Sequence, residues 1–395
     1  MEIYETAEKI KEYSAKYKKV CIITCSDSPL DSRVFYKEAK SLKKFGYDVT
    51  VIAPSNTNKV HVVDGINVIE IKEFGPRLIR WFLLLIGLFR RSLEVHADIY
   101  HCHDPDLFPV TALLRILKKN VIYEVREYYS DVILITTLPM KFYLIFTLSI
   151  LEPLFCKFFD IIITTDEGIA KRYKKFNKKV YPIFNFPSFE VFKPSNNQDM
   201  KMKYKDYFVI IYVGGMSEER GILELIKAVH KVSRTYPLVK LLLLGNFGTQ
   251  DFEERCIEYV RSSDLTESVE FLGFVPHTEI PKYIDAADVG AVLLHPTTRF
   301  MKTAYPIKLF EYMICGKTVI ASNLPAMSGI IKDSSCGVLV NPIDIKEIAE
   351  AIIYLLEHPE EAKKMGENGR RAVEEKYNWT EMEKELIKIY FKIGD

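Results

Sequence analysis

The sequence is short of net charge, paired cysteines and long apolar runs. Its 54 basic and 53 acidic residues leave a formal net charge of +1, so no overall electrostatic field favours binding to nucleic acid. The seven cysteines, an odd number without paired spacing, favour a reducing compartment. The polar, charged start is not typical of a signal peptide, and no apolar run reaches the roughly 18–20 residues that span a bilayer. These absences predict a cytoplasmic protein.

What the chain has instead is ample material for hydrophobic cores, because 48% of its 395 residues are hydrophobic. At roughly 100–200 residues per domain, this length predicts two or three domains. A strand–helix–strand pattern opens each half of the chain and implies parallel sheets. Its ranges are Lys19–Ser26, Val34–Phe45 and Val49–Ala53, then Phe208–Val213, Ile222–Val232 and Val239–Gly245. We predict α/β domains over residues 1–190 and 207–378, joined by a proline-containing linker at 191–206.

The most informative stretch runs from Thr303 to Asn323. Pro306 fits the first position of a helix, which should run to Ile314. Lys308 and Glu311 are three residues apart and therefore lie on one face of this helix. A helix start favours phosphate, and a carboxylate one turn further along can accept hydrogen bonds from sugar hydroxyls. The stretch therefore predicts a site for a ribose phosphate.

A second candidate phosphate site follows the predicted strand Phe208–Val213. Gly214 and Gly215 allow backbone N–H groups to approach a phosphate, and Arg220 can add charge-assisted hydrogen bonds. On its own, a Gly-Gly pair is equally compatible with a plain tight turn.

Polar residues also follow the strands of the first half, at the edge where parallel sheets bind ligands. Asp31 and Arg33 come after the first strand, and Arg126 and Glu127 leave the strand that begins at Asn120. We expect these side chains at a ligand-binding surface, with ordinary surface ion pairs as the alternative. Arg126 cannot act as a base at neutral pH, but it could hold a phosphate or an acidic acceptor.

The segment from His101 to Asp104 allows two interpretations. A metal site formed by His101, Cys102 and His103 is disfavoured, because neighbouring side chains on a strand point to opposite faces. We instead expect His103 and Asp104, at the end of the strand, to line a ligand-binding surface.

The run Lys308-Leu309-Phe310-Glu311-Tyr312-Met313, followed by Gly316 and by Val319-Ile320-Ala321-Ser322, resembles the donor-site signature of the retaining glycosyltransferases of family 4, or glycosyl transferases group 1. The resemblance covers roughly residues 19–392. It implies the GT-B architecture, in which two Rossmann-like, doubly wound parallel-sheet domains face a cleft. It also implies that a C-terminal helix, here 379–395, crosses back to the first domain.

The resemblance further implies the contacts to a nucleoside diphosphate sugar. Glu311 would bind the ribose, while Arg220 and Lys308 would hold the diphosphate and stabilise the leaving phosphate. Thr303 stands where the family usually has a second glutamate, over the sugar. The other donor contacts that it implies are Gly214, Gly215, Val275, Ala304, Tyr305 and Leu309.

The acceptor side implied by the resemblance consists of Asp31, Arg33, His103, Asp104 and Glu127. Arg126 replaces a histidine that borders the reacting sugar in the family, so His103 and Arg126 are further catalytic candidates. Asp104-Pro105-Asp106 mimics the Asp-x-Asp metal motif of the other glycosyltransferase architecture, but follows a strand of the first domain, which is the wrong context. We expect no metal and no cofactor other than the sugar nucleotide, which is a substrate.

Two apolar segments bear on membrane contact. Leu78–Phe89 contains Trp81 and is accompanied by Arg77, Arg80, Arg90 and Arg91, while Met140–Phe159 is interrupted by several charges. Each segment either covers a buried sheet as a helix or lies in a membrane interface, with basic side chains at lipid headgroups. The second alternative predicts peripheral contact with the inner face of a membrane through Leu78 to Arg91.

We therefore expect a hexosyltransferase that moves a sugar from a UDP- or GDP-sugar to a glycan or lipid-linked acceptor with retention of configuration. Such an enzyme would act in polysaccharide or glycolipid biosynthesis. Two alternatives stay open: a sugar-nucleotide epimerase of the same architecture, and a catalytically silent homologue that only binds the sugar nucleotide. The second is suggested by Thr303 and Arg126, which stand at two positions where the family usually has active residues.

Overall fold

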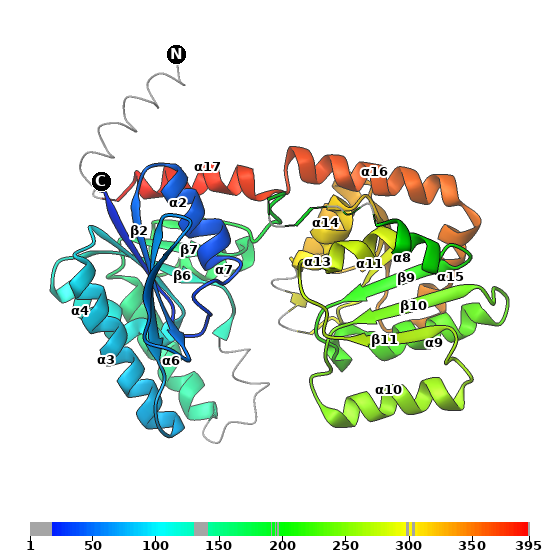
Figure 1. Cartoon of the computed structure of the whole chain (residues 1–395), viewed down its shortest axis with the longest axis horizontal. Helices are drawn as coiled ribbons and strands as arrows, with labels where there is room; N and C mark the ends of the chain where they lie inside the picture. The colour runs from blue at the N-terminus through cyan, green and yellow to red at the C-terminus, as the bar shows by residue number, and fades with distance from the viewer. Residues whose placement is uncertain are drawn as a thin grey trace, which may run out of the picture. The chain divides into compact units, whose positions relative to one another are not determined.

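The computed structural model describes residues 18–129, 141–190, 192–193, 195, 197–297, 300–301 and 305–393, with the backbone alone for 77–78 and 141–148. The chain divides into two compact units, coloured mainly blue to teal and green to orange in Figure 1. Unit 1 comprises Met1–Asn185 with Trp379–Asp395, and unit 2 comprises Phe186–Asn378. Each unit is an α/β fold built on its own sheet, as predicted.

Unit 1 contains an eight-stranded sheet in the order β3-β4-β2-β1-β5-β6-β7-β8. Its neighbouring strands are parallel except for the hairpin of β3 and β4. The central strands are runs of Val and Ile buried on both sides, as parallel sheets require. The strands are β1 (Lys19–Ile23), β2 (Asp48–Ser55), β3 (Val60–Val63), β4 (Ile66–Lys72), β5 (Ile99–His103), β6 (Asn120–Val125), β7 (Ile161–Thr164) and β8 (Val180–Pro182).

Helices cover both faces of this sheet. One face packs against α3 (Arg77–Val95), α4 (Phe108–Ile116), α6 (Lys141–Cys156) and α7 (Glu167–Tyr173). The other face packs against η1 (Val34–Ala39), α2 (Lys40–Lys44) and α17 (Trp379–Tyr390). A short 3-10 helix, η2 (Pro105–Leu107), leads into α4.

The helix predicted at Val34–Phe45 begins as a π-helix, η1, and continues as α2. The N–H groups of Tyr36 and Glu38 donate to carbonyls five residues earlier, on Asp31 and Arg33. Asp31 also caps this start, because its Oδ1 accepts from the N–H of Arg33 at 2.8 Å and of Val34 at 3.0 Å. Single π-turns are rare and often occur at functional sites.

Unit 2 contains a six-stranded parallel sheet in the order β11-β10-β9-β12-β13-β14. Numbered within the unit, this order is 3-2-1-4-5-6, the strand order of the Rossmann fold. The strands are β9 (Phe208–Val213), β10 (Val239–Leu244), β11 (Val269–Gly273), β12 (Val289–Val292), β13 (Thr318–Ser322) and β14 (Gly337–Val340).

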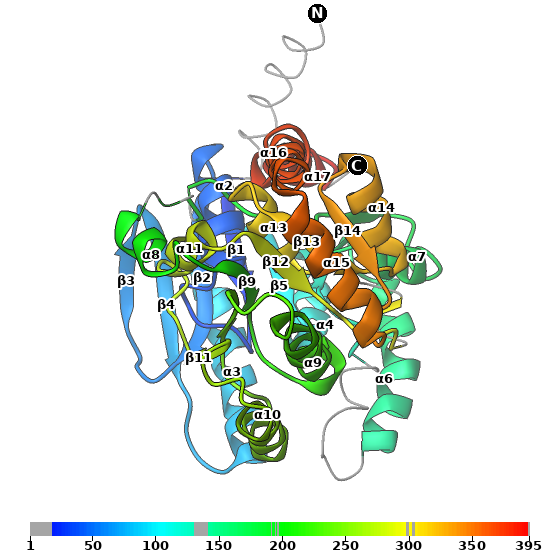
Figure 2. The ribbon, with the colours of Figure 1, turned by 90° about the vertical axis from the view of Figure 1, so that its right-hand side faces the viewer.

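The helices of unit 2 again form two layers (Figure 2). On one face, α9 (Ile222–Ser233), α10 (Gln250–Ser262) and α15 (Ile345–Glu357) build a core with the sheet. Elsewhere, α13 (Ile307–Ile314) and α16 (Pro359–Glu375) pack against each other and against β13. The remaining helical segments are α8 (Gln198–Lys203), η3 (Glu218–Arg220), α11 (Ile280–Ala286) and α14 (Pro325–Ser334).

The segment predicted as a linker packs on unit 2. Within it, Phe192 packs against His277, and just before it Phe186 makes edge contacts with the rings of Phe310 and Tyr377. The boundary between the units therefore falls at 185/186, before the predicted linker. At the other end of the chain, Trp379 opens α17, whose apolar side chains fill the core of unit 1.

None of the helices described in the structure has both the length and the continuous apolar character needed to cross a bilayer.

Candidate functional site

The strand order of unit 2 locates a binding edge. In open parallel sheets ligands bind beyond the carboxyl ends of the strands, where the strand order reverses. In this sheet the reversal lies between β9 and β12, which are neighbours. The chain leaves β9 at Gly214, so the predicted glycine pair lies at the topological switch point of the sheet.

Helix α13 is fixed close to this point by Tyr312. The ring of Tyr312 lies flat over β12 at Gly290, where an added Cβ would come within 2.3 Å of the ring. The hydroxyl oxygen of Tyr312 accepts a hydrogen bond of 2.9 Å from the backbone N–H of Val213, the last residue of β9. The start of α13, one turn before Tyr312, is therefore held beside the glycine pair.

Lys308 is the side chain that this arrangement brings to the glycines. It is buried, and its Nζ donates to the hydroxyl of Tyr212 at 2.8 Å and lies 3.9 Å from the centre of that ring. The Tyr212 hydroxyl in turn donates to the carbonyl of Gly215 at 2.7 Å. Tyr212 thus connects the lysine on α13 to the loop after β9.

Arg220, on η3, reaches the same place from the other side. Its Nη1 donates to the carbonyl of Gly215 at 3.2 Å. A methyl group placed on Gly214 would lie 3.0 Å from the Nζ of Lys308 and 3.7 Å from the Nη1 of Arg220. Gly214 also has a φ of 123°, which side chains rarely adopt. Two cations therefore converge on a backbone position that only glycine suits.

No carboxylate neutralises these cations in the part of unit 2 that the structure describes, where neither Lys308 nor Arg220 forms an ion pair. Burial and the neighbouring positive charge of Arg220 hold the pKa of Lys308 well below its usual range, although Glu311 partly opposes them. An anion bound beside Gly214 would relieve both the repulsion and the missing solvation.

Glu311 lies on the same helix, one turn further along. It is buried, and its Oε1 lies 3.0 Å from the Nε2 of His277, which follows β11. Its Oε2 accepts no hydrogen bond from the described residues. The segment around Val275, another predicted donor contact, is therefore tied to the predicted ribose-binding glutamate.

The remaining predicted donor contacts differ in their surroundings. Val275 is half-buried in the loop after β11, and Tyr305 is half-buried just before α13. The side chain of Leu309 is buried in the core, and its N–H donates to the carbonyl of Pro306, so neither part faces a ligand. Thr303 and Ala304 lie outside the described residues.

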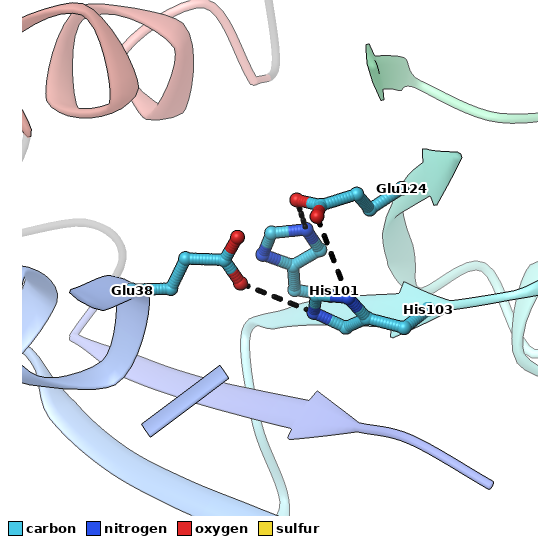
Figure 3. Close-up of side chains that lie close together, drawn as sticks. All are labelled: Glu38, His101, His103 and Glu124. Carbon is cyan, nitrogen blue, oxygen red and sulfur yellow. Dashed lines mark ion pairs between the residues drawn. The ribbon is translucent and has the colours of Figure 1, made fainter. Parts of the chain in front are cut away.

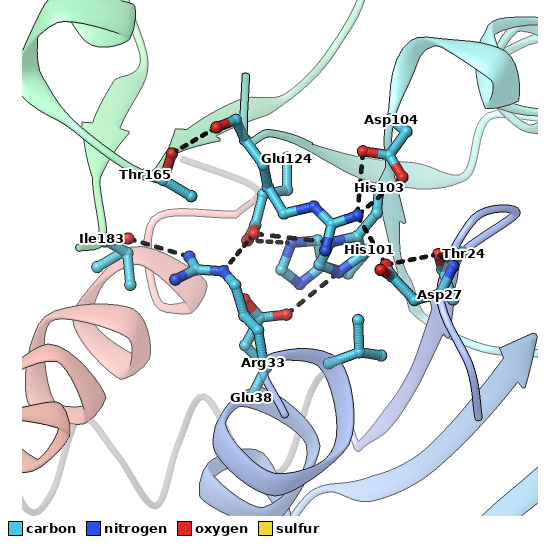
Figure 4. A network of polar contacts seen from close by, with 12 residues as sticks. Thr24, Asp27, Arg33, Glu38, His101, His103, Asp104, Glu124, Thr165 and Ile183 are labelled. Carbon is cyan, nitrogen blue, oxygen red and sulfur yellow. Dashed lines mark hydrogen bonds and ion pairs between the residues drawn. The ribbon is translucent and has the colours of Figure 1, made fainter. Parts of the chain in front are cut away.

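Unit 1 has its own switch point, between β1 and β5. The residues that leave these strands form a polar cluster with Arg126, which follows β6 (Figure 4). The Nη2 of Arg126 lies 2.7 Å from Asp27 Oδ2 and 3.0 Å from Asp104 Oδ2. Ser26 and Tyr129 also donate hydrogen bonds to Asp104.

Asp104 is held in an unusual backbone conformation, with φ 69° and ψ 149°. This region is occupied almost only by glycine and is typical of functional sites when another residue is found in it. Burial alone would raise the pKa of Asp104, but Arg126 and the hydrogen bonds from Ser26 and Tyr129 outweigh it, so its pKa is lowered. Arg126 is correspondingly locked between two carboxylates, whose charge exceeds its own.

A second network lies deeper in unit 1. The Nε of Arg33 lies 2.6 Å from Glu124 Oε1 and 2.9 Å from Glu38 Oε1, and its Nη2 donates to the carbonyl of Ile183 at 3.0 Å. The Nε2 of His103 lies 3.1 Å from Glu38 Oε2, and its Nδ1 lies 3.6 Å from Glu124 Oε1 (Figure 3). Against the effect of burial, the two glutamates raise the pKa of His103.

Burial alone would raise the pKa of Glu124, but Arg33 and His103 outweigh it and hold that pKa well below its usual range. Arg33 and protonated His103 together neutralise the two glutamates. We therefore reassign Arg33 and His103, which are 2% and 0% exposed, from acceptor contacts to residues that hold the interior of unit 1. Burial by partners distant in the sequence is the reason for the change.

His101 completes this network. Its ring stacks on that of His103, its Nδ1 lies 2.8 Å from the Tyr390 hydroxyl of α17, and its Nε2 lies 3.3 Å from Glu124. Cys102 packs in the core on the opposite face of the sheet, as strand alternation predicted.

The four residues Glu38, His101, His103 and Glu124 could each offer one metal-ligand atom, all within 4.8 Å of one another. The guanidinium of Arg33, however, contacts both carboxylates at hydrogen-bond distance and already neutralises one of them. A divalent cation would have to displace the proton of His103 and lie beside this positive charge. The charges therefore favour an ion-pair network over a metal centre.

Sequence reasoning missed several members of these sites: Asp27, Glu38, Tyr129, Tyr212, His277 and Tyr312. Each of these residues joins its site through a contact with a residue at least 34 positions away or through a tyrosine hydroxyl. Neither kind of contact can be recognised from neighbouring residues in the sequence. Of the other predicted acceptor residues, Asp31 caps η1, and Glu127 is half-buried at the exit of β6.

The two units match two family models. Residues 32–186 match the model of Glycosyltransferase Family 4, and residues 195–372 match the model of Glycosyl transferases group 1. The chain is thus a glycosyltransferase homologue with the GT-B fold of two parallel-sheet α/β domains, which confirms the predicted fold class.

Individual relatives agree with this class. The chain is 23% identical over 375 residues to "Uncharacterized glycosyltransferase MJ1607" of Methanocaldococcus jannaschii, which covers 89% of this chain and 91% of the relative. It superposes on sucrose-phosphate synthase from Thermosynechococcus elongatus with a TM-score of 0.74, 20% identity, and 94% and 98% of the two chains covered. A structure of Anabaena Alr3699/HepE with UDP and glucose gives 0.73 at 16% identity, with 94% and 99% covered.

Proposed function

We propose that the protein transfers a hexose from a nucleoside diphosphate sugar to an acceptor hydroxyl, with the donor bound by unit 2. The observation that supports this most directly is the convergence of Lys308 and Arg220 on Gly214, with no carboxylate to neutralise them among the described residues. A diphosphate is the ligand that supplies the missing negative charge at a glycine bend.

The chemistry follows from where charge develops. As the bond between the sugar and the diphosphate breaks, negative charge accumulates on the leaving phosphate. Protonated Lys308 and Arg220 would stabilise that charge, while Glu311 would fix the donor by accepting hydrogen bonds from the ribose. These two cations perform the task that a divalent metal has in other phosphate chemistry, so we propose a metal-independent reaction that needs no cofactor.

We propose retention of configuration, by attack of the acceptor hydroxyl on the face that the phosphate leaves. The leaving phosphate would then take the proton of the acceptor. The family resemblance around Lys308 and Glu311 supports this stereochemistry. Unit 1 would contribute to the acceptor side through the cluster of Asp27, Asp104 and Arg126, which lies at its switch point and contains a strained backbone.

The acceptor is proposed to be a glycan or a lipid-linked sugar, in polysaccharide or glycolipid synthesis at the inner face of a membrane. The basic, apolar segment from Leu78 to Arg91 supports a lipid-linked acceptor. UDP-glucose is the first donor to test, because Anabaena Alr3699/HepE was crystallised with it. GDP-sugars belong in the same series.

The test combines binding with turnover. A panel of nucleotides and sugar nucleotides should contain at least one compound that raises the melting temperature by mass action. That donor, radiolabelled in the sugar, is then incubated with the protein, membrane lipid extract and glycans, with and without EDTA. We expect label in lipid or glycan, unchanged by EDTA.

Other outcomes would contradict the proposal in different ways. An altered sugar nucleotide without transfer would identify an epimerase. Binding without turnover would identify a silent homologue, for which the locked position of Arg126 would then be the first explanation. Loss of transfer with EDTA would refute metal independence alone.

A further inference from the structure

Helix α3 exposes a continuous apolar stripe. Its inner face buries Leu84, Leu85 and Leu88 in the core of unit 1. Its outer face presents Ile79, Phe82, Leu83 and Ile86, which are 49–62% exposed and follow the three- and four-residue spacing of one helix face. Soluble proteins seldom expose a continuous apolar stripe of this length, so the outer stripe of α3 needs an explanation.

The neighbouring helices extend this apolar surface. Helix α4 contacts α3, and the ring of Phe108 on α4 stacks on Phe155 of α6 at 4.9 Å. All three helices cover the same face of the sheet. Large apolar side chains at least 40% exposed occur at Leu113, Ile116 and Leu117 around the end of α4, and at Ile150, Leu151, Leu154 and Phe158 on and after α6. We call these residues and the α3 stripe the three-helix face.

Basic side chains outnumber acidic ones around the three-helix face. The described basic residues of the three helices are Arg80, Arg90, Arg91 and Arg115, and Lys118, Lys119 and Lys157 follow directly after α4 and α6. The acids of the three helices are Glu94 and Glu152, and acids also lie beside them: Glu73 pairs with Arg80, Asp160 pairs with Arg115, and Asp106 is exposed just before α4. Glu152 is buried, bonded to Arg172 and Tyr173, and Glu94 pairs with Arg90 and Arg91 at the end of α3.

Unit 2 shows that this composition is not general in the protein. Among its described residues, the large exposed apolar side chains are scattered over different elements, for example Met202, Leu238, Phe274 and Ile343. The exposed faces of α10 and α16 consist mainly of charged residues of both signs. The three-helix face is therefore a local feature of unit 1. Its charges indicate which kind of partner could bind there.

We propose that the three-helix face binds the surface of an anionic lipid bilayer. The apolar stripe would enter the boundary between headgroups and acyl chains, and Arg80, Arg90, Arg91 and Lys118 would contact lipid phosphates. A second copy of the chain fits less well, because two such faces would bring cations together. The inference extends the predicted contact of Leu78 to Arg91 to α4 and α6, and it is independent of the donor chemistry proposed for unit 2.

The test measures co-sedimentation of the full chain with two kinds of vesicle, at low and high salt. One kind is phosphatidylcholine, and the other is phosphatidylcholine with an equal amount of phosphatidylglycerol. We expect binding to the anionic vesicles that weakens at high salt. The variants F82Q/I86Q and R90Q/R91Q should each raise the lipid concentration for half-binding roughly tenfold or more.

A matched control removes exposed apolar groups elsewhere in unit 1. Val60 and Val62, on the edge strand β3, are 65% and 64% exposed, so V60T/V62T should bind vesicles like the natural sequence. Light scattering of the natural sequence and of F82Q/I86Q measures the oligomeric state of each. The melting-temperature shift given by a nucleotide should be the same in F82Q/I86Q, which separates this proposal from the donor site.

Three results would overturn the proposal. The first is no binding to anionic vesicles at low salt, and the second is binding that survives both double substitutions. The third is a dimer that F82Q/I86Q dissociates in the absence of vesicle binding, which would assign the face to self-association. If no nucleotide raises the melting temperature of the natural sequence or of any variant, the donor site would be refuted and the membrane proposal would be unaffected.

Discussion

The two units treat their buried and half-buried cations in opposite ways. In unit 1, Arg33 lies between two glutamates and Arg126 between two aspartates, so each cation is neutralised within the protein. In unit 2, Lys308 and Arg220 meet at Gly214, and no carboxylate among the described residues pairs with them. A neutralised cation stabilises a fold, whereas one left without a counter-charge marks the place of an anionic ligand.

This contrast can be measured because the two tryptophans, Trp81 and Trp379, both belong to unit 1. Tryptophan fluorescence therefore follows the unfolding of unit 1, and calorimetry follows both units.

Removing the cation from the interior of unit 1 should have the largest effect on stability. Arg33→Met leaves Glu38 and Glu124 buried without their main counter-charge, and should lower the free energy of unfolding by about 3–5 kcal/mol. The measurement is a urea titration followed by tryptophan fluorescence. Lys174→Met, which breaks an exposed pair with Glu167 in the same unit, is the control and should leave the curve unchanged. A similar, small effect of both substitutions would remove the special role of Arg33.

The same kind of substitution in unit 2 should act on catalysis and not on stability. Lys308→Met should lower kcat by about 10²–10³-fold, as for the loss of one group that stabilises transition-state charge. The ligand-free protein should be no less stable, because a buried amine with a lowered pKa is replaced by an apolar chain. Calorimetry and a transfer assay check this. Lys317→Met is the control, since Lys317 donates to the carbonyl of Asp285 away from the glycines, and it should keep the natural rate.

Glu311→Ala should weaken nucleotide binding about tenfold, because a hydrogen bond to a charged group contributes about 1.5–3 kcal/mol. Calorimetric titration with a nucleoside diphosphate and its 2′- and 3′-deoxy analogues makes the test specific. The natural sequence should discriminate against at least one analogue, and the variant should not. His277→Ala, which removes the present partner of Glu311, is the comparison. Equal discrimination by the natural sequence and Glu311→Ala would take the ribose away from this residue.

Binding of a diphosphate should be accompanied by proton uptake at Lys308. The pKa of Lys308 is held well below its usual range in the free protein, and a bound anion would raise it. Affinity should therefore rise as the pH falls toward the pKa of the free protein. Titrations in buffers of different ionisation enthalpy measure the uptake, which Lys308→Met should abolish. Proton release, or uptake that persists in the variant, would contradict this assignment.

The smallest expected effect is the pH dependence of unit 1. His103 has a raised pKa in the folded state, so its contribution to stability is present below the unfolded pKa of about 6.5 and is lost as the pH rises through the folded value. Glu124 has a lowered pKa, so its contribution is lost as the pH falls well below about 4.5. Urea midpoints from tryptophan fluorescence should therefore fall on both sides of a plateau. His103→Gln should flatten the alkaline side, and it should also weaken the acid side in part, because His103 helps to lower the pKa of Glu124.

The sequence predicted the parts of the molecule that depend on local pattern. The sequence located the strand Phe208–Val213, the glycine pair that follows it and the helix after Pro306. Hydrophobic periodicity, helix-capping residues and glycine turns all depend on residues close together in the sequence. The glycine pair and the start of the helix lie side by side at Gly214 because of the strand order of the sheet. Each βαβ unit contributes to that order.

What the sequence could not predict depends on distant partners. Arg33 and Glu124 are 91 residues apart in the sequence. Both lie near the ends of strands, where a side chain can equally well line an exposed ligand-binding surface or be buried. Nothing local distinguishes the π-turn of η1 from the α-helix expected there, although this turn places Glu38 against His103. The pairing of His277 with Glu311 was missed for the same reason.

Helix α17 has a consequence for the order in which the chain can fold. Unit 2 is made of one continuous segment, so all its parts are available once Asn378 has been synthesised. Most of unit 1 is synthesised before unit 2, yet its core lacks Trp379, Leu386 and Tyr390 until the residues that follow unit 2 have been synthesised. Unit 2 can thus complete its fold before unit 1, and during that interval the unfilled core of unit 1 is open to chaperones.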